Sequence, residues 1–254
     1  MIMVFTMTFV ACGPGHQPDI NVEQAHNPDA QKILAPGLGT IGVIRDGAVH
    51  VYYPDEGGQW HRDEASRFRI PQKNRGVLAM GNGVLGVVQK GRINFYRMDE
   101  QNQWQQEEAY TFELPRRYDR LVAMKMPRGP GAVGIESDGM IRFSYFDNME
   151  WQTEPWATFV VPGGITGCYA MGDMTMAVTD GQKLGLYYLV PEEGWEFMDH
   201  DAFVLLLPDA HDGIIPLDHH SIAVLKGDGL HFFQLDIEND RWLSLPRLHF
   251  ELPW

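Results

Sequence analysis

Apolar and polar residues follow one another in short runs, and the same order of runs recurs five times along the chain. A recurrence opens with an apolar segment such as Leu121-Val122-Ala123-Met124, and a second apolar segment with a small residue follows, such as Val133-Gly134-Ile135. After a turn come residues of alternating character, such as Ile141-Arg142-Phe143-Ser144-Tyr145. Alternation with a period of two is typical of strands with one buried face. The pattern therefore predicts an all-β chain.

A tight turn separates the second and third predicted strands of every unit. Its residues are Asp46-Gly47, Lys90-Gly91, Asp138-Gly139, Asp180-Gly181 and Asp228-Gly229. Asp-Gly between two apolar runs favours a two-residue hairpin turn, because both turn residues then adopt a positive φ that these residue types tolerate. We therefore expect a hairpin at this point in each unit, with a positive φ at both turn residues.

Two markers measure the length of the repeat. Tryptophans at 60, 104, 151, 195 and 242 are 44, 47, 44 and 47 residues apart. Prolines at 71, 115, 162, 208 and 253, each after a further apolar stretch, are 44, 47, 46 and 45 residues apart. Four short strands in each unit of about 45 residues are typical of a β-propeller. We therefore predict a five-bladed β-propeller with four-stranded antiparallel blades over residues 33–254.

The repeated residues also predict how the blades are packed. Each tryptophan begins the predicted outer strand, where a large ring can fill the space between adjacent blades. Small residues on the second strands, namely Gly42, Gly86, Gly134 and Ala177, are expected to let the inner strands approach one another near the axis. The units begin and end in phase with the chain, so no exchange of strands between the first and last blades is expected.

This architecture resembles the tachylectin-type lectins, which are five-bladed propellers with a tryptophan in each repeat of similar length. The resemblance rests on the repeat number and on the spacing of the five tryptophans. It implies the propeller fold and makes carbohydrate binding one possible function. The sugar-binding motif of that family is absent from this sequence, so no binding residues are carried over.

The N-terminal segment indicates export. Residues 1–10 are uncharged and mostly apolar, and Phe9-Val10-Ala11-Cys12 resembles the lipobox of bacterial lipoproteins. The resemblance implies a signal peptide over residues 1–12, lipid attachment at Cys12 and a location on the bacterial cell envelope. Residues 13–32 are polar and lack an apolar period, which predicts a flexible tether. Cleavage by an ordinary signal peptidase, or an apolar N-terminus that is buried or disordered, are the alternatives.

Composition excludes some classes of partner. The chain has 34 acidic and 20 basic residues and a formal net charge of −14. Nucleic acid is not an expected partner, because binding to phosphates depends on an excess of Lys and Arg. No apolar run approaches the ~20 residues that a membrane-spanning helix needs. If Cys12 is lipidated, Cys168 has no partner for a disulfide, and its position in an apolar run predicts a buried core residue.

The loops that join successive blades differ from one another, and such loops commonly carry function on a repeated scaffold. Two of them contain candidate partner-binding residues, which are Arg116, Arg117, Tyr118 and Arg120 in one loop and Asp209, His211 and Asp212 in another. The first group is the densest basic cluster in the chain and suits an anion or an acidic partner. An ordinary solvent-exposed turn is the alternative for both.

Histidine and aspartate near the start of the fifth unit raise the question of a metal site. Asp209, His211 and Asp212 precede its first strand, and Asp218, His219 and His220 follow that strand. These residue types suit zinc, but their spacing matches no known motif. The two groups are also expected at opposite ends of the strand, so we predict neither a metal site nor a cofactor.

The loops before the tryptophans are rich in acidic residues and are expected to share one face of the disc. They carry Asp55, Glu56, Asp99, Glu100, Asp147, Glu150, Glu192, Glu193, Asp236, Glu238 and Asp240. The summed field of such an acidic rim would attract a basic partner or cations and would weaken with added salt. The alternative is that these residues are ordinary constituents of polar turns.

Three functions are compatible with these patterns. The uniform units and the absence of nucleophile, phosphate-loop and zinc-protease motifs favour a non-enzymatic, lipid-anchored binding or scaffold subunit with a protein partner. A carbohydrate-binding lectin with pockets between the blades is the first alternative. A hydrolase at the mouth of the axial channel is the second, and it would need paired carboxylates there, with Asp209 and Asp212 as the residues to test.

Overall fold

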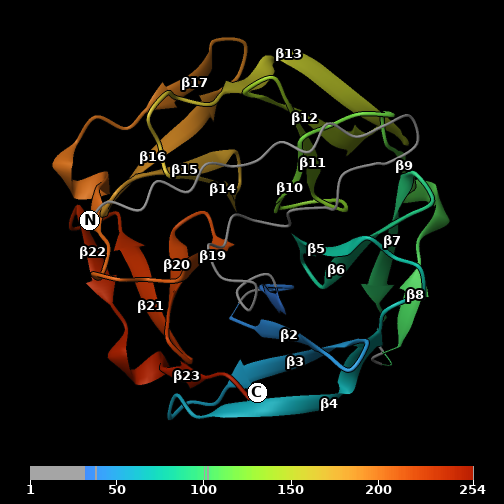
Figure 1. Ribbon diagram of the computed structural model, residues 1–254, viewed down its shortest axis with the longest axis horizontal. Coiled ribbons are helices and arrows are strands. Elements are labelled where there is room, and N and C mark those ends of the chain that lie inside the picture. The colour runs from blue at the N-terminus through green and yellow to red at the C-terminus, as the bar shows by residue number, and fades with distance from the viewer. Residues whose placement is uncertain (1–31, 38, 100, 102, 254) are drawn as a thin grey trace, which may run out of the picture.

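The computed structural model describes residues 32–37, 39–99, 101 and 103–253 of the chain. Five small antiparallel sheets stand around a common centre, as Figure 1 shows. Each sheet is formed by strands that are consecutive in the sequence, and we number these blades 1 to 5 in chain order. The prediction of an all-β, five-bladed propeller is therefore confirmed.

Three strands of each blade follow one another outward from the centre. The inner strands are β1 (Ile33–Leu34), β5 (Gly76–Gly81), β10 (Arg120–Met124), β14 (Gly167–Gly172) and β19 (Gly213–Asp218). The second strands are β2 (Ile41–Arg45), β6 (Val84–Gln89), β11 (Ala132–Ser137), β15 (Thr175–Asp180) and β20 (Ser221–Lys226). The third strands are β3 (Ala48–Pro54), β7 (Arg92–Met98), β12 (Met140–Asp147), β16 (Lys183–Val190) and β21 (Gly229–Asp236).

The outer strand is interrupted at the same point in every blade. In blades 1 and 3 it is a single strand, β4 (Trp60–Arg69) or β13 (Glu150–Val160), with a bulge in which residues 64–67 or 154–157 lie opposite one residue of the third strand. In the other blades a short 3-10 helix divides it. The segments are β8 (Trp104–Gln106), η2 (Glu108–Tyr110) and β9 (Phe112–Glu113); β17 (Gly194–Phe197), η3 (Asp201–Phe203) and β18 (Leu205–Leu206); and β22 (Arg241–Ser244), η4 (Pro246–Leu248) and β23 (Phe250–Glu251).

In blades 1 to 3 the interruption supplies a hydrogen-bond acceptor for the next blade, whereas the indole N–H groups of Trp60 and Trp242 have no partner among the described residues. The indole N–H groups of Trp104, Trp151 and Trp195 donate to the carbonyls of Ser66, Tyr110 and Ala157, at 3.0, 3.1 and 3.2 Å. All three carbonyls belong to the bulge or 3-10 helix of the preceding blade. A regular outer strand would direct these carbonyls along its own ladder, so the break in the strand is part of how blades are joined. The sequence pattern did not predict this break.

The hairpin turns follow the prediction in blades 1 to 3 and differ from it in blades 4 and 5. Asp46 and Gly47 have φ values of 51° and 70°, as a turn with two positive φ angles requires. In blade 4, however, Asp180 pairs with Lys183, so the turn residues are Gly181 and Gln182, and φ is positive only at Gly181. In blade 5 the turn is likewise shifted by one residue and begins at Gly227. Glycine in the first turn position suits the other common hairpin turn, which needs only one positive φ.

Each blade junction is filled by aromatic and aliphatic side chains. The apolar residue three positions before each repeat proline is buried, as Phe68, Phe112, Phe159, Leu205 and Phe250 show. Trp151 packs on Phe95 and Phe112 of blade 2, with ring centroids 5.5 and 4.9 Å apart. Trp195 contacts Phe159 of blade 3 in the same way, at 5.3 Å. The expectation that the repeated tryptophans lie between adjacent blades is therefore confirmed.

The same contacts close the ring between the last blade and the first. Trp60 of blade 1 stacks on Phe232 of blade 5 at 5.4 Å and contacts Phe250 at 5.0 Å. The guanidinium of Arg45 donates to the carbonyl of Pro253 at 2.6 Å. Within the described residues, neither end of the chain adds a strand to the sheet of the other end. Among the described residues, these ring contacts and the Arg45 hydrogen bond join the last blade to the first.

The glycines on the second strands have their closest neighbours on the third strands, and not on the inner strands as expected. A Cβ atom on Gly134 would lie 2.7 Å from the Phe143 ring and 2.8 Å from Ile141, and one on Gly86 would lie 2.9 Å from Ile93. These neighbours belong to the third strand of the same blade, not to an inner strand near the axis. The glycines therefore make room for large third-strand side chains within one sheet.

Hydrogen bonds connect the segments between the first and second strands of different blades near the axis. The ammonium group of Lys125 in blade 3 donates to the carbonyls of Pro216 and Leu217 in blade 5, at 2.8 and 2.6 Å. The Asp173 backbone N–H of blade 4 donates to the carbonyl of Lys125 at 2.7 Å. The Asn82 side-chain amide of blade 2 donates to the Met126 carbonyl at 2.7 Å. The Gly83 backbone N–H of blade 2 donates to the Pro36 carbonyl of blade 1 at 3.0 Å, so all five blades are tied together at this end of the inner strands.

Residues 1–31, with the predicted signal segment, Cys12 and most of the tether, lie outside the described part of the chain. Over the residues that are described, no helix has the length and apolar character that crossing a membrane demands. Cys168 is only 1% exposed, as its apolar surroundings in the sequence predicted. Burial raises the pKa of its thiol to about 11, so the thiol remains protonated at neutral pH and is a poor nucleophile.

Candidate functional site

The loop that joins blades 2 and 3 divides the predicted basic cluster into an exposed and a buried pair. Arg116 and Arg117 are exposed, whereas Tyr118 and Arg120 are only 4% and 6% exposed. Residues 118 and 120 point the same way as the chain enters the inner strand, which puts both side chains in the interior. The prediction that all four residues face a partner is therefore wrong for Tyr118 and Arg120, and partner binding stays a prediction for Arg116 and Arg117.

Arg120 instead connects blades 3 and 4. Its Nε atom donates to Glu136 Oε2 at 2.6 Å, and its Nη1 atom donates to the Cys168 carbonyl at 3.1 Å. Glu136 lies on the neighbouring strand β11, opposite Arg120 in the register. Such a buried ion pair specifies one arrangement of the junction and needs both of its partners.

Arg117 lines the larger of two cavities found at blade junctions, which we name the 2–3 cavity. It measures about 580 Å³ and lies between blades 2 and 3. Its lining residues are Phe112, Glu113, Leu114, Pro115 and Arg117 from blade 2 and the joining loop, with Ile135, Ser137, Arg142, Ser144, Trp151 and Thr153 from blade 3. A cavity of this size, with an apolar part and a few polar groups, is typical of sites for small ligands.

The polar groups of the 2–3 cavity are suited to binding. Arg117 and Arg142 supply guanidinium donors, and the hydroxyls of Ser144 and Thr153 lie 2.6 Å apart. Glu113 is the one carboxylate among the described residues that line the cavity. Two positive charges with one negative charge favour a ligand that carries acidic or hydroxyl groups.

Sequence reasoning identified Arg117 but missed Arg142, Ser144 and Thr153. Arg142 and Ser144 are the polar members of the alternating third strand, positions that normally face solvent. They line a cavity because the preceding blade stands beside them, and neither residue type nor spacing reveals that neighbour. The signal available in the sequence was the placement of an arginine and a serine two residues apart on one strand face.

The side chains of the second predicted partner-binding group contact residues of their own loop or of the adjacent hairpin turns. The group consists of Asp209, His211 and Asp212. Asp209 accepts a hydrogen bond from the Gln182 side chain, and Asp212 Oδ2 accepts one from the Gly227 backbone N–H at 2.8 Å. The His211 ring lies 3.2 Å from the Pro208 carbonyl. In blade 3, Asp119 Oδ2 accepts a hydrogen bond from the Asp138 backbone N–H at 3.1 Å, as Asp212 does from Gly227. These aspartates therefore fasten blade-joining loops to hairpin turns, while a role in partner binding stays a prediction.

The histidines and aspartates near β19 do not come together. Asp212 precedes this strand and His219 and His220 follow it, so the two groups lie at opposite ends of the strand. The rings of His219 and His220 contact each other at 3.8 Å. Over the described residues, no group of three or more His, Cys, Asp or Glu side chains is placed to hold a metal ion.

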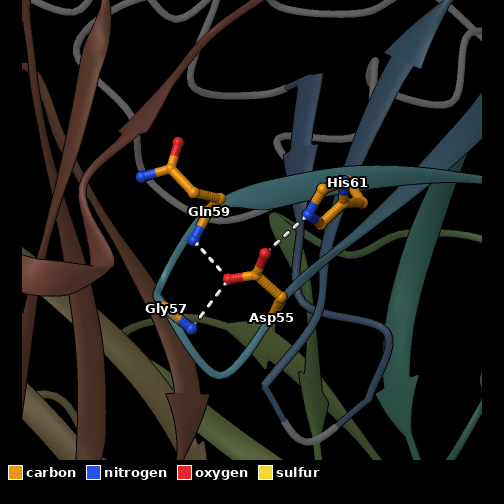
Figure 2. Close-up of polar contacts among 4 residues, drawn as sticks. All are labelled: Asp55, Gly57, Gln59 and His61. Carbon is orange, nitrogen blue, oxygen red and sulfur yellow. Dashed lines mark hydrogen bonds and ion pairs between the residues drawn. The ribbon is translucent and has the colours of Figure 1, made fainter.

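The acidic loops share one face of the disc, because strands alternate in direction and every loop from a third to an outer strand lies at the same end. Glu100 lies outside the described residues, and the other ten predicted rim residues lie in or beside these loops. Three of the described rim residues accept hydrogen bonds from backbone N–H groups of their own loops. Figure 2 shows that Asp55 accepts hydrogen bonds from the backbone N–H groups of Gly57 and Gln59, both at 2.9 Å. Asp99 and Asp236 accept comparable bonds in their own loops.

The rim carboxylates also differ in how strongly they hold their charge. Nε2 of His61 lies 2.9 Å from Asp55 Oδ2 (Figure 2). This hydrogen bond, together with the Gln59 and Gly57 backbone N–H groups, lowers the pKa of Asp55. The Gln103 backbone N–H has the same effect on the pKa of Asp99. A role of the rim in attracting a basic partner stays a prediction.

Replacing His61 with alanine is expected to raise the pKa of the Asp55 carboxyl toward the ordinary value, because its largest stabilising contact is lost. Carbon-detected NMR of the side-chain carboxyl over an acid titration measures this shift. Since the native pKa is lowered, the contact stabilises the fold above the ordinary pKa and is lost as the pH falls through the lowered one. His231→Ala, on an exposed position of blade 5, should leave the Asp55 titration unchanged, and an equal shift in both variants would contradict the assignment.

Comparisons with known proteins assign no family to this chain. No family model matches the chain, and no curated protein matches it. Among solved structures, it is similar to Hsv2 of Kluyvelomyces marxianus, with 11% identity, a TM-score of 0.39 and coverage of 85% of this chain and 83% of that one. It is also similar to a protein from Lactobacillus plantarum, with 9% identity, a TM-score of 0.38 and coverage of 82% and 68%. A third similar structure is a candidate 6-phosphogluconolactonase from Bacteroides uniformis. It has 8% identity and a TM-score of 0.40, and the match covers 84% of this chain and 68% of that one.

Proposed function

We propose that this protein is a non-enzymatic binding subunit of a bacterial envelope complex, anchored by a lipid on Cys12, and that a protein partner docks at the 2–3 cavity. The observation that carries the docking site is the open cavity of about 580 Å³ at this one junction of blades 2 and 3. The envelope location is supported by the lipobox-like residues Phe9-Val10-Ala11-Cys12. Incorporation of a labelled fatty acid that is lost in a Cys12→Ser variant would test the anchor separately.

The charge of the cavity supports a partner that inserts an acidic side chain. Arg117 of the joining loop and Arg142 of blade 3 both line the cavity, while the chain as a whole is strongly acidic. A carboxylate held between two guanidinium groups forms charge-assisted hydrogen bonds, which are stronger than bonds between neutral groups. The remainder of the acidic surface would repel acidic proteins, so the cavity would also direct the partner to one place.

Three features support binding without catalysis. Glu113 is the single carboxylate among the described lining residues, whereas hydrolysis of glycosidic bonds ordinarily uses a pair. Asp209 and Asp212, the carboxylates considered for a hydrolase at the axis, are already bonded to Gln182 and Gly227. The thiol of Cys168 is buried and protonated.

The test compares capture of envelope proteins by the wild-type chain and by an Arg117→Ser/Arg142→Ser variant. Removing both guanidinium groups is expected to weaken binding of the specific partner by at least about tenfold, the effect of losing a charge-assisted contact. Arg128→Ser is the matched control, because Arg128 is exposed near the opposite ends of the strands. Quantitative mass spectrometry of the captured proteins measures the difference. If the double variant captures the same proteins at the same level as the control, the docking site is wrong.

Carbohydrate binding is the second candidate, favoured by the aromatic residues Trp151 and Phe112 beside the hydroxyls of Ser144 and Thr153. Aromatic faces next to a few precisely placed polar groups are a common way to bind a polar ligand with apolar patches. A glycan array with the full chain distinguishes the two functions. A signal that disappears in Thr153→Val, while protein capture is unaffected by the arginine changes, would favour the carbohydrate ligand over the protein partner.

A further inference from the structure

A second cavity lies where the ring closes, between blade 5 and blade 1, and we name it the 5–1 cavity. It measures about 350 Å³. Its position matches that of the 2–3 cavity, because the same second- and third-strand positions line both. Val43 and Arg45 correspond to Ile135 and Ser137, and Pro253 corresponds to Pro115. The lining chemistry is different, so the two cavities suit different ligands.

The 5–1 cavity is strongly basic. Arg45, Arg62 and Arg67 line it, and Asp46 is the only carboxylate among its described lining residues. Arg45 Nε lies 3.5 Å from Asp46, and Arg62 Nε lies 3.0 Å from Glu64. Both contacts are exposed to solvent and so contribute little. Arg67 forms no ion pair with any described residue. A concentration of positive charge on a chain of net charge −14 requires a local reason.

His50 provides a polar group in the interior of the same cavity. It is 7% exposed, it lines the cavity, and its ring atom Nδ1 has no hydrogen-bond partner among the described residues. A buried polar atom without a partner costs free energy, so a native site that keeps one commonly binds something there. Burial lowers the pKa of His50, and Arg62 and Arg67 lower it further, against the weaker opposite effects of the Arg45 backbone and of Glu64.

The bulge in β4 creates this arrangement. Residues 64–67 lie opposite His50, so the outer strand bends there, and Arg62 and Arg67 line the same cavity as the histidine. Asp63 holds the bend by accepting hydrogen bonds from the backbone N–H groups of Ala65 and Ser66, at 3.0 and 3.3 Å. The guanidinium positions are therefore supported by a structured backbone, as binding sites require.

From this geometry we propose that the 5–1 cavity binds a phosphate group, with Arg45, Arg62 and Arg67 contacting its oxygens and His50 at the buried end. Three guanidinium groups match a tetrahedral anion that carries between one and two negative charges, because each can donate two parallel N–H groups to it. A monovalent planar carboxylate would leave part of this charge unmatched. The proposal is independent of the protein partner proposed above, because it concerns a different cavity.

The site also predicts a consequence for stability. The arginines and His50 belong to blade 1, whereas Pro253, whose carbonyl accepts the Arg45 hydrogen bond, belongs to the end of blade 5. No sheet is shared across this junction among the described residues. A phosphate bound between the two blades would therefore raise the melting temperature, because it binds the closed ring and not the unfolded chain.

The experiment measures binding of inorganic phosphate, glycerol 3-phosphate and acetate to the full chain by NMR of the histidine ring signals. Phosphate and glycerol 3-phosphate should shift the His50 signals and raise its pKa, since an anion offsets the effect of the arginines. Acetate should bind more weakly by about tenfold or more. Tighter binding of glycerol 3-phosphate than of phosphate would identify a phosphate monoester as the ligand, whereas equal binding would identify the free anion.

Arg67→Gln is expected to weaken phosphate binding by about tenfold and to reduce the rise in melting temperature at a given phosphate concentration. The matched control is Arg69→Gln, which removes the same charge from the same strand at a residue that does not line the cavity. Circular dichroism confirms that both variants are folded. If both variants bound phosphate equally weakly, the effect would come from the net charge of the protein, and the proposal would be overturned. Unchanged NMR signals of the His50 ring in saturating phosphate would also overturn it.

Discussion

Replacing Trp151 with alanine is expected to lower the free energy of unfolding by about 3–5 kcal/mol, the usual cost of removing a large aromatic side chain from a packed interior. The indole contacts Phe95 and Phe112 of the preceding blade and Phe146 of its own blade, with centroids 5.5, 4.9 and 5.5 Å away. Its N–H donates to the Tyr110 carbonyl. Alanine would leave a cavity at a junction between two blades, and the carbonyl would lose its donor.

Urea denaturation followed by circular dichroism measures the change in the free energy of unfolding, and thermal denaturation measures the melting temperature. For a domain of this size the melting temperature should fall by roughly 6–20 °C. Trp151→Phe keeps an aromatic ring but has no N–H group, so it should lower the free energy of unfolding by a smaller amount, about 1–2 kcal/mol. Val160→Ala, on the same strand β13 but 66% exposed, should change stability by less than about 0.5 kcal/mol. If Trp151→Ala were no more damaging than Val160→Ala, the junction role of the repeated tryptophans would be wrong.

Arg120→Met is expected to cost about 3–5 kcal/mol, because it leaves the Glu136 carboxylate without its partner in a largely buried position. The side chains of Arg120 and Glu136 are 7% and 19% exposed, and the guanidinium lies 2.6 Å from the carboxylate. The same change removes the donor for the Cys168 carbonyl in blade 4. The effect should therefore be large although no apolar volume is lost.

A double-mutant cycle tests this explanation. Combining Arg120→Met with Glu136→Leu should recover most of the stability, since replacing both members of a buried pair with apolar residues is often neutral. Arg116→Met, in the same loop and exposed, should have an effect within about 0.5 kcal/mol. A double variant that is as unstable as the sum of the two single variants would show that the pair contributes no coupling.

The candidate sites were less accessible to sequence reasoning than the fold. The densest basic cluster in the chain was visible as a cluster, but half of it proved to be interior, with Arg120 paired to Glu136 on the neighbouring strand. The positive residues that do line a cavity were not adjacent in the sequence. Arg117 and Arg142 are separated by a hairpin and two strands, and both reach the 2–3 cavity because two blades stand side by side.

The division of the outer strand shows why local pattern was insufficient. The residues after each tryptophan differ between blades, so no shared motif marks the bulge or the 3-10 helix. In blades 1 to 3 the interrupted segments share the indole of the following blade, which takes a carbonyl at that point, in the bonds to Ser66, Tyr110 and Ala157. The requirement belongs to the partner across the junction, so it is absent from the pattern of the strand itself.

The amino-acid sequence by itself determined the number of blades, the order of their strands and the hairpins of blades 1 to 3. Each of these depends on residues a few positions apart, through the period of two, the Asp-Gly turns and the regular spacing of the tryptophans. The tertiary structure alone decided which side chains meet between blades. Arg45 and Pro253 are 208 residues apart in the chain, yet they share a cavity because closure of the ring brings the first and last blades together. Contacts of this kind depend on the packing of whole sheets, which no local pattern encodes.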